Sequence, residues 1–587
     1  MVGPCDRRAR EPRVDARKAA SAHGGFGRRL QVVRSSWPLL TRAKTNSTQA
    51  ALAAGAGVVS HLAYFIRGEH HNNGITIIFF YLSLLPCLTF LQYHYLQVPL
   101  ITSAVQTAVL AVSYAAGLYG SMLVYRGVFH PLRKFPGPFW ARFSNLYHSW
   151  LLVEKSDNYR LMTKLHEQYG DFVRTGPANL SVNVPEAVQL VLGSKSKCYK
   201  SPWYDTSLPL VNLHSTRDIK AHELRRKVFN KAFSPAALVA YEERITPLSN
   251  LFCEKVAAFN GAAFNATHWF KYFAFDAMGE LGLGESFHML EKEDNRWIPA
   301  LLMAGMADIA QLQPVPWSTP ILHRLPFMAK GPKDFIGFVW QQVLKRKERG
   351  SDRQDILGFL LAAYEKSEKK NADYQWLRGD SRLTIVGGSD TTASTLCFIF
   401  YYLAKYPEQV QKLRDEFMPL LAASGKDHLD TKDVAKAVHL NGVIHEALRL
   451  NPPIPSGYPR VTPPEGMTIR GTYIPGGTTV VIPLRTLGRS EACYERATEF
   501  VPERWYSRPE MNKHKDTFAS FGIGPYACIG KALSLVEIRN FIVKVLTRFD
   551  VEFAPGEDGE AFMEGAKDHF IIEVPDLKLA FKERKLL

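Results

Sequence analysis

The feature that most constrains this chain is an uncharged apolar run of 26 residues, Leu100–Tyr125. A helix needs about 20 apolar residues to cross the hydrocarbon core of a bilayer, so this run predicts a membrane span. Two apolar stretches precede it. Ile75–Gln92 has 18 residues and predicts a second span, whereas Ala51–Ile66 has 16 and is short for a third. Residues 51–129 are therefore expected to form a membrane anchor with two or three transmembrane helices.

The positive charge of the chain is concentrated before the anchor. Of a formal net charge of +16, residues 1–50 contribute +8, from eleven Lys/Arg and three Asp/Glu. We interpret this segment as a basic, disordered extension, with a mitochondrial transit peptide as the alternative. A basic balance is also typical of nucleic-acid binding, but the chain has neither zinc-finger spacing nor a basic helix leading into heptads. No nucleic-acid partner is predicted.

The orientation of the anchor stays open on sequence grounds. Arg126, Arg133 and Lys134 follow the last span, so the positive-inside rule places the large domain in the cytosol. The basic N-terminus favours the same side, which requires an even number of spans. Three spans would instead place the sequon Asn46-Ser47-Thr48 in the lumen.

Residues 130–587 are predicted to form one large domain that is mostly α, in the α+β class. The proline-rich segment His130–Pro138 predicts a hinge between anchor and domain. Period-2 patterns with Gly/Pro turns predict two strand pairs, and apolar residues at helical spacing predict long helices. The strand pairs are Phe172–Pro177 with Leu180–Val184 and Met467–Tyr473 with Thr478–Ile482; the helices are His222–Phe233, Leu383–Leu403, Pro407–Leu421, Val434–Leu450 and Ala532–Phe549.

Seven cysteines are scattered along the chain without any Cys-x-x-Cys pair, so no disulfide framework is predicted. Cys528 differs from the others because it lies in a glycine-rich loop, Phe521–Gly530, directly before a predicted helix. Loop N–H groups and a helix N-terminus stabilise a thiolate, which favours a ligand role; a structural cysteine is the alternative. The other six are predicted to be small buried apolar residues: Cys5, Cys87, Cys198, Cys253, Cys397 and Cys493.

This loop resembles the haem-binding loop of the cytochrome P-450 superfamily, Phe-x-x-Gly-x-x-x-Cys-x-Gly. The resemblance implies the cytochrome P-450 fold over about residues 130–580 and a haem b cofactor whose iron is ligated by the Cys528 thiolate. It also assigns Phe521, Gly524 and Gly530 to the haem-binding loop. The superfamily usually has a basic residue two positions before the cysteine. This chain has Tyr526 at that position, and its Gly-Pro-Tyr sequence resembles that of filamentous-fungal members of the superfamily.

A second motif, Gly387-Gly388-Ser389-Asp390-Thr391-Thr392, lies inside a predicted helix. Two glycines within a helix cost about 1 kcal/mol each relative to alanine, which predicts that some group approaches the backbone closely. A Ser/Thr-rich kink is the alternative. The motif resembles the acid–threonine pair on the superfamily's helix that crosses the haem. By that resemblance Thr391 hydrogen-bonds the iron-bound peroxo group and Asp390 relays protons.

A third motif places Glu446 and Arg449 one helical turn apart, with Pro502-Glu503-Arg504-Trp505 downstream. Glu-x-x-Arg alone occurs by chance in a chain of this size. Its position between the acid–threonine motif and the cysteine loop, however, matches the order in the superfamily. The resemblance makes Glu446, Arg449 and Arg504 a buried structural triad with no step in the chemistry.

The resemblance also assigns two arginines to the anionic haem propionates. They are Arg460 and Arg226, the latter in His222-x-x-x-Arg226, where histidine replaces the usual tryptophan; a solvated basic face is the alternative for Arg226. No flavin or nicotinamide motif occurs in the chain, so NADPH-cytochrome P-450 reductase is the expected electron donor. A positive surface would attract the acidic face of that reductase. Its expected residues are Lys220, Arg225, Lys227, Lys231 and Lys531.

Together the resemblance predicts a haem-thiolate monooxygenase that inserts one oxygen atom of O2 into an apolar small molecule, with electrons from NADPH. The anchor resembles that of fungal secondary-metabolism members, which implies a secondary metabolite as substrate. The endoplasmic reticulum is the expected membrane, with the domain facing the cytosol. The alternatives are a haem-thiolate isomerase or dehydratase, whose members tend to lack the acid–threonine pair, and a non-catalytic haem-binding membrane protein. By family analogy, substrate contacts are expected from residues 203–213, 297–320, 383–394, 454–458 and 564–571.

Overall fold

The computed structural model describes residues 47–153, 156–322, 324–325, 330–350, 354–425 and 429–584. The chain divides into two compact units. The anchor unit comprises Met1–Gly68 and Ile75–Val124, and the large unit comprises Glu69–Gly74 and Tyr125–Leu587. Glu69–Gly74 therefore belongs to the large unit, although anchor helices flank it in the sequence. The predicted extension at residues 1–50 lies outside the described residues except for its last four.

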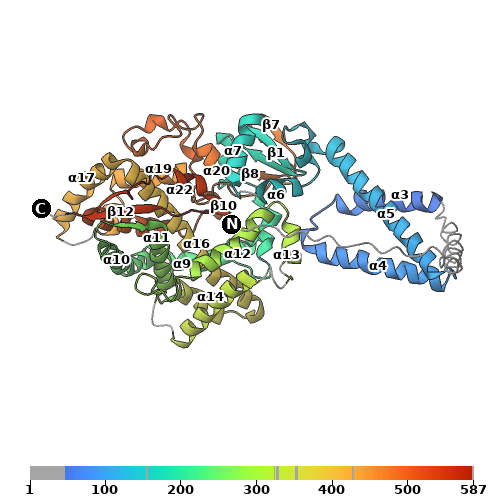
Figure 1. Ribbon diagram of the computed structural model, residues 1–587, viewed down its shortest axis with the longest axis horizontal. Helices are drawn as coiled ribbons and strands as arrows, with labels where there is room; N and C mark the ends of the chain where they lie inside the picture. Colours follow the sequence, from blue (N-terminus) through green and yellow to red (C-terminus); the bar gives the residue numbers. More distant parts are fainter. Residues whose placement is uncertain are drawn as a thin grey trace, which may run out of the picture. The chain divides into compact units, whose positions relative to one another are not determined.

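Three apolar helices form the described part of the anchor unit: α3 (Ser47–Ser60), α4 (Gly74–His94) and α5 (Leu100–Val124) (Figure 1). The helical stretches 71–94 and 100–129 are long and apolar enough to cross a membrane, as the two predicted spans require. The first apolar stretch, α3 with the π-helical turn η1 (His61–Phe65), is not among the helices that meet this criterion. A third helix that does, α16 (Lys370–Lys405), is mostly buried inside the large unit, so its apolarity serves packing.

The large unit is mainly helical, as predicted. Caps and breakers delimit its helices: Ser234 accepts the N–H of Ala237 at the start of α10, and Pro235 takes the first helical position. Besides α16, the helices are α6 (Leu146–Val153), α7 (Asn158–Tyr169), α8 (Pro185–Leu192), α9 (Ile219–Ala232), α10 (Pro235–Ala257), α11 (Ala266–Met278), α12 (Ile298–Leu312), α13 (Thr319–Leu322), α14 (Lys330–Glu348), α15 (Ile356–Glu365), α17 (Pro407–Ser424), α18 (Thr431–Val434), α19 (Val438–Leu450), α20 (Leu484–Gly488), α21 (Lys531–Arg548) and α22 (Glu560–Gly565).

The strands are short and gather in four small sheets. The largest has the order β1-β2-β8-β5-β3, in which β2 and β8 are parallel and the other neighbours are antiparallel. Its strands are β1 (Phe172–Gly176), β2 (Asn179–Val182), β3 (Tyr199–Lys200), β5 (Arg460–Val461) and β8 (Thr479–Val481). The remaining strands are β4 (Ala263–Asn265), β6 (Met467–Ile469), β7 (Thr472–Ile474), β9 (Phe549–Phe553), β10 (Lys567–His569), β11 (Ile571–Glu573) and β12 (Lys578–Glu583).

The first predicted strand pair is confirmed as the antiparallel pair β1–β2, but the second is wrong. The hairpin there is β6–β7, and it turns at Arg470 and Gly471, both with positive φ. Two successive residues with positive φ make the turn that suits a two-residue hairpin. The strand after Pro475 leaves the hairpin and joins β2 and β5 in the largest sheet.

The predicted hinge at residues 130–138 is also wrong, because this segment packs into the large unit. It forms a 3-10 turn, Pro131–Lys134, whose Leu132 is fully buried, and Phe135 is buried next to it. The carbonyl oxygen of Pro136 accepts the N–H of Arg174 at 2.7 Å. Prolines stiffen this segment, and its apolar side chains hold it against β1 and its neighbours.

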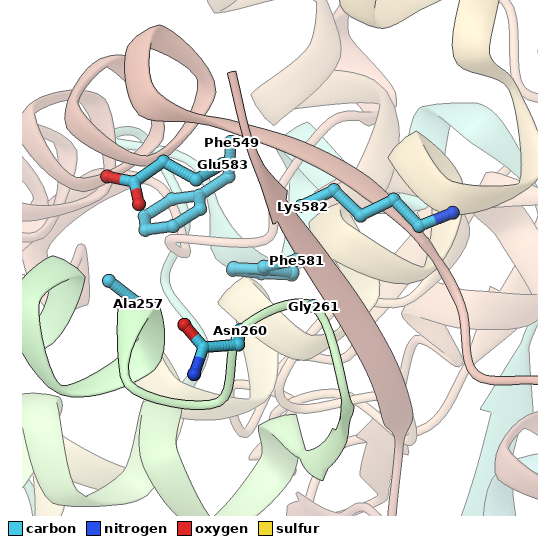
Figure 2. A pocket seen from close by; sticks show the side chains of 7 residues that line it. All are labelled: Ala257, Asn260, Gly261, Phe549, Phe581, Lys582 and Glu583. Atoms are coloured by element: carbon cyan, nitrogen blue, oxygen red, sulfur yellow. The ribbon is translucent and has the colours of Figure 1, made fainter. Parts of the chain in front are cut away.

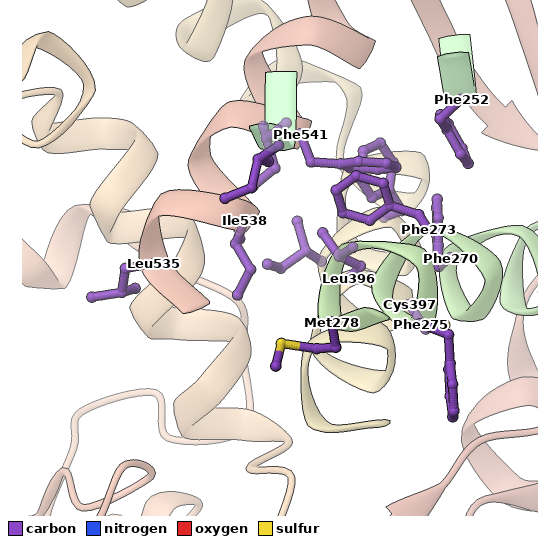
Figure 3. Close-up of a cluster of buried hydrophobic side chains, with 14 of the residues drawn as sticks. Phe252, Phe270, Phe273, Phe275, Met278, Leu396, Cys397, Leu535, Ile538 and Phe541 are labelled. Atoms are coloured by element: carbon purple, nitrogen blue, oxygen red, sulfur yellow. The ribbon is translucent and has the colours of Figure 1, made fainter. Parts of the chain in front are cut away.

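The predicted helices exist, with different limits. The helix expected at Leu383–Leu403 begins thirteen residues earlier, at Lys370. The helix expected at Val434–Leu450 is two helices, α18 and α19, separated at residues 435–437. The fully buried residues of α16, α11 and α21 form the main core, in which phenylalanine rings pack edge to face or tilted (Figure 3). Phe541 of α21 lies 4.5 Å from Phe273 and 4.6 Å from Phe252, between ring centroids.

Four of the six cysteines predicted to be buried are buried: Cys198, Cys253, Cys397 and Cys493. Cys87 is exposed, which contradicts the prediction. It lies on α4, a helix without buried residues, whose apolar side chains suit lipid rather than a protein core. Cys5 lies outside the described residues.

Candidate functional site

Cys528 lies in a tightly folded loop before α21. Its N–H donates to the carbonyl oxygen of Phe521 at 2.7 Å. Gly524 has a φ of +69°, and a Cβ there would lie 2.5 Å from the carbonyl oxygen of Leu192. A Cβ on Gly530 would lie 3.9 Å from the Cys528 sulfur. Gly530 thus lies next to the sulfur and Phe521 holds the backbone of Cys528, whereas Gly524 packs against Leu192 and Gly193.

Cys528 is an exposed residue, in contrast to the buried cysteines of the described large unit. Its loop is nevertheless set among protein atoms, and this burial raises the pKa of the thiol. The backbone N–H groups of Gly530 and Lys531 and the guanidinium of Arg226 oppose the effect by lowering that pKa. A metal cation deprotonates a coordinating thiol outright, so this donor set fits a thiolate ligand to iron.

The two adjacent glycines of the α16 motif, Gly387 and Gly388, serve different purposes. A Cβ on Gly388 would clash with the side chain of Met278 in α11, so this glycine permits close helix packing. A Cβ on Gly387 would meet only the side chain of Leu383, at 3.8 Å. Packing therefore explains Gly388 alone. At Gly387 the carbonyl oxygen accepts the hydroxyl of Thr391 at 2.7 Å.

The acid–threonine motif is in contact with the helix that follows the cysteine loop. Thr392 donates to Glu537 of α21 at 3.4 Å and lies 3.5 Å from the hydroxyl of Ser534. Asp390 is buried, and burial raises its pKa to about 6. Burial also raises the pKa of Glu537 to about 8. Two carboxyl groups with raised pKa values thus lie on α16 and α21, and the charges that act on Asp390 are those of Lys271 and Glu573.

Lys200 and Arg460 form a buried pair of like charges. They stand directly opposite each other in the antiparallel strands β3 and β5. Their exposed fractions are 2% and 4%. Like charges at opposite positions destabilise a strand pair. Burial, together with the charges of Arg460 and Arg226, lowers the pKa of Lys200 to about 6.

These cations surround Tyr526, the residue that replaces the usual basic side chain. The ammonium of Lys200 lies 4.8 Å from the ring centroid and the guanidinium of Arg460 lies 5.0 Å from it. The ring of His222 lies 4.8 Å away between centroids. Arg226 donates to the carbonyl oxygen of Ala527 at 2.8 Å.

Lys200 donates to the carbonyl oxygens of Leu213 and His214, at 3.1 and 2.6 Å, and an anion carrying two carboxylates would relieve the repulsion that Arg460 and Arg226 exert on its charged form. The propionates of haem meet that requirement, and the cluster lies at the loop that holds Cys528. The residues present therefore fit the cofactor that the resemblance implies. Arg226 and Arg460, predicted from the sequence, both belong to the cluster, and Lys200 joins them.

The predicted triad is confirmed. Glu446 accepts from Arg449 at 2.9 and 2.7 Å and from Arg504 at 2.9 Å. Trp505 and the N–H of Val501 also donate to the same carboxylate, each at 2.9 Å. Burial of an ion pair requires such complete hydrogen bonding. The triad joins α19 to the 3-10 turn η9 (Pro502–Trp505).

The predicted positive surface is confirmed only in part. Lys220, Lys227 and Lys231 of α9 and Lys531 of α21 are exposed. Arg225 is not available to a partner protein, because it forms an ion pair with the buried carboxylate of Asp380 in α16. Burial raises the pKa of Asp380 to about 6 in spite of that pair.

Figure 2 shows a cavity of about 330 Å³ elsewhere, at the β12–β9 edge. None of its seven lining residues belongs to the predicted site. We assign it no role. The lining residues are Ala257, Asn260, Gly261, Phe549, Phe581, Lys582 and Glu583.

Sequence reasoning missed two residues near the predicted site. Lys200 stands alone in a short strand, and only strand register places it opposite Arg460. Glu537 lies nine residues after Cys528 on a helix predicted to be amphipathic, and only its burial distinguishes it from a surface acid. The position of Glu537 on the apolar face of that helix was the only sequence signal that could have indicated its burial.

Comparisons with known proteins agree with this geometry. A sequence profile described as Cytochrome P450 matches residues 136–581. The chain is 38% identical over 529 residues to the cytochrome P450 monooxygenase notG' of Aspergillus versicolor, covering 90% of this chain and 97% of that protein. It is 38% identical over 560 residues to the tryprostatin B 6-hydroxylase of Aspergillus fumigatus, covering 94% and 99%. It is 37% identical over 548 residues to the cytochrome P450 monooxygenase lcsK of Purpureocillium lilacinum, covering 92% and 99%.

Proposed function

Because the chain belongs to the cytochrome P450 family, we propose that it hydroxylates an apolar secondary metabolite in a membrane. The family itself makes the protein a P450 monooxygenase, an oxidoreductase that incorporates oxygen. The isomerase and the non-catalytic alternatives lose their support, because the relatives are named monooxygenases or a hydroxylase. One set of contacts supports the assignment of the site: the cation cluster contacts the cysteine loop at Tyr526 and Ala527, and the acid–threonine helix contacts α21, which follows that loop.

Cys528 would ligate the haem iron, and Phe521, Gly524 and Gly530 would shape the loop that presents its sulfur. When bound, the haem supplies the activation of O2 and the transfer of oxygen to substrate. The N–H groups that face the Cys528 sulfur hold negative charge there. The tight turn at Gly524 and the hydrogen bond from the Cys528 N–H to Phe521 keep this sulfur in one position.

Asp390 and Thr391 would move protons to the reaction. The Asp390 carboxyl is suited to exchange protons near neutral pH, since burial raises its pKa to about 6. The Thr391 hydroxyl donates to Gly387 and retains its lone pairs as acceptors.

Replacing Asp390 by asparagine is expected to lower NADPH-driven product formation by roughly a hundredfold, the usual contribution of a positioned acid. In the wild type the rate should fall as pH rises through about 6, because the Asp390 carboxyl loses its proton there. The variant should lose this inflection. Rate measurements between pH 5 and 8 check both results. Asp390→Glu should restore part of the rate, and an asparagine variant with the wild-type pH profile would contradict the proposal.

Lys200, Arg226 and Arg460 would hold the two propionates. Replacing Lys200 by methionine should speed haem loss to a haem-scavenging protein by about tenfold, because a buried charge-assisted hydrogen bond disappears. Lys200→Arg should lose haem at nearly the wild-type rate. Lys220→Met, on the exposed side of α9, is the matched control. Equal rates of haem loss for Lys200→Met and wild type would remove Lys200 from the set.

The electron donor would be NADPH-cytochrome P-450 reductase, attracted by the exposed lysines of α9 and α21. The membrane would be the endoplasmic reticulum, with the large unit in the cytosol. Two helices of spanning length support membrane attachment. The basic residues Arg126, Arg133 and Lys134 after α5 support the orientation.

The substrate class follows from the relatives and from the apolar composition of α12, which is expected to face the pocket. One relative is named for the hydroxylation of tryprostatin B. Microsomes that contain the full chain and a P450 reductase provide the test. We expect a thiolate-type carbon-monoxide spectrum, and product formation from apolar secondary metabolites that requires both NADPH and O2. Turnover without reductant, or a protein that never binds haem, would refute the proposal.

A further inference from the structure

The segment Glu69–Gly74, which we call the strap, is fastened to the large unit by charged side chains. The guanidinium of Arg217 donates two hydrogen bonds to Glu69, both at 2.7 Å. It also donates to Asp205 at 2.7 Å. The Nε2 atom of His71 lies 2.7 Å from the same carboxylate.

Three members of the cluster are partly buried, whereas the side chain of Glu69 is 40% exposed. The exposed fractions of the Arg217, Asp205 and His71 side chains are 18%, 16% and 10%. Burial by itself would raise the pKa of Asp205, but hydrogen bonds from His71 and Arg217 lower it below its usual range. Glu69, His71 and Asp205 are close enough to share a metal ion. Arg217 already supplies the positive charge, so we interpret the cluster as structural.

The strap is tied to the part of the large unit that is expected to contact substrate. Asp205 lies in the 3-10 helix η6 (Pro202–Ser207), whose Trp203 packs 4.5 Å from Phe570 between ring centroids. Arg217 also donates to the carbonyl oxygen of Lys200 at 3.0 Å. The strap is therefore connected to the candidate site through Asp205 of η6 and through Arg217, which contacts Lys200. That these residues border the substrate and haem sites rests on the proposed function.

Within the anchor unit, α3 runs parallel to α5. Ala54 lies against Gly117, where a Cβ would come within 2.7 Å of the Ala54 carbonyl carbon. Farther along both helices, His61 forms a 2.8 Å hydrogen bond with Ser121. Small residues at the contact and a polar bond between helices are typical of helices that pack inside a membrane.

Helix α4 runs antiparallel to α5. Tyr81 lies 2.6 Å from Tyr114 between hydroxyl oxygens. Thr89 donates to Thr107 at 3.1 Å. The helices α4 and α5 thus form a hairpin that leaves from the strap and returns to Tyr125, both of which belong to the large unit.

We infer that the anchor crosses the membrane three times, with the strap on the side of the large unit and residue 47 on the opposite side. Helix α3 ends at the strap and is parallel to α5, so its first residue must lie at the far end of the hairpin. With η1 it comprises 19 helical residues, 14 and 5, about 28 Å at 1.5 Å per residue. That length is close to the roughly 30 Å core of a bilayer.

The charge distribution near the membrane is compatible with this topology. Orientation depends mainly on Lys and Arg within about 15 residues of the spans. Three such basic residues precede residue 47 in the sequence: Arg34, Arg42 and Lys44. Four lie on the side of the strap and the large unit: Arg67, Arg126, Arg133 and Lys134. The remaining basic residues of the N-terminal segment lie farther from the membrane, where the rule weakens.

The topology is tested with the full chain in microsomes, using an N-glycosylation sequon added before residue 1, one inserted at Gly68 and one inserted at Gln97. We expect the sequons before residue 1 and at Gln97 to carry glycans, and the sequon at Gly68 to carry none. A glycan at Gly68 would overturn the three-span topology. So would an N-terminus without a glycan that is digested by protease added to intact vesicles. Each preparation is also examined by its carbon-monoxide spectrum, so that a failed topology is distinguished from a failed haem enzyme.

The fastening is tested by hydrogen exchange on the haem-loaded protein. Removing both strap groups, with Glu69→Ala and His71→Ala, should raise exchange of residues 202–207 by about fivefold to tenfold, as expected for loss of a small ion-pair network. The control is Asp171→Ala, which removes an exposed ion pair with Arg470. Unchanged exchange at 202–207 in the strap variant would refute the fastening.

Discussion

Replacing Cys528 by serine is expected to abolish the thiolate-type carbon-monoxide spectrum and to reduce product formation to below about one hundredth of the wild type. Removing even an outer contact of a metal site costs about 10–100-fold, and this substitution would remove the proposed ligand itself. A serine hydroxyl has a much higher pKa than a thiol, so the N–H groups that face this position could not hold it as an anion. Reduced carbon-monoxide spectra and turnover assays measure both effects.

Cys87→Ser is the control for this experiment, because Cys87 is exposed on α4. It should retain the spectrum and the turnover of the wild type. A Cys528→Ser protein with an unchanged thiolate-type spectrum would show that another residue ligates the iron. The assignment of the loop Phe521–Gly530 would then fail.

Replacing Glu446 by glutamine is expected to destabilise the large unit by about 3–5 kcal/mol, since two fully buried guanidinium groups lose their counter-charge. Such a loss is a large fraction of the stability of a typical protein. The variant should therefore show a much lower yield of folded, haem-containing protein and a lower unfolding midpoint. Thermal unfolding of the full chain in detergent, with haem content measured in parallel, checks the result.

Glu254→Gln provides the matched control, because Glu254 is an exposed residue within α10. Its effect should stay within about 0.5 kcal/mol. If Glu446→Gln unfolded at the same temperature as Glu254→Gln, the triad would not be needed for stability. Activity per bound haem should be similar in all three proteins, since the triad takes no part in the chemistry.

Much of the candidate site could be predicted from the sequence because its motifs are local. The cysteine loop, the acid–threonine pair and Glu-x-x-Arg each place chemistry-bearing residues within one loop or one helical turn. Hydrophobic length alone predicted α4 and α5. The prediction of strand pairing failed where a tight turn determines the partner. Arg470 and Gly471 both have positive φ, so β6 pairs with β7 and not with β8.

The sequence by itself thus determined the family, the candidate ligand cysteine and the two helices of membrane-spanning length, because these depend on neighbouring residues and on apolar length. Only the tertiary structure determined which residues, distant in the sequence, contact each other. Lys200 meets Arg460 through strand register, and Glu69 meets Arg217 although 148 positions separate them. Such pairs carry no local pattern, because the free energy that joins them arises only when folding removes both partners from water.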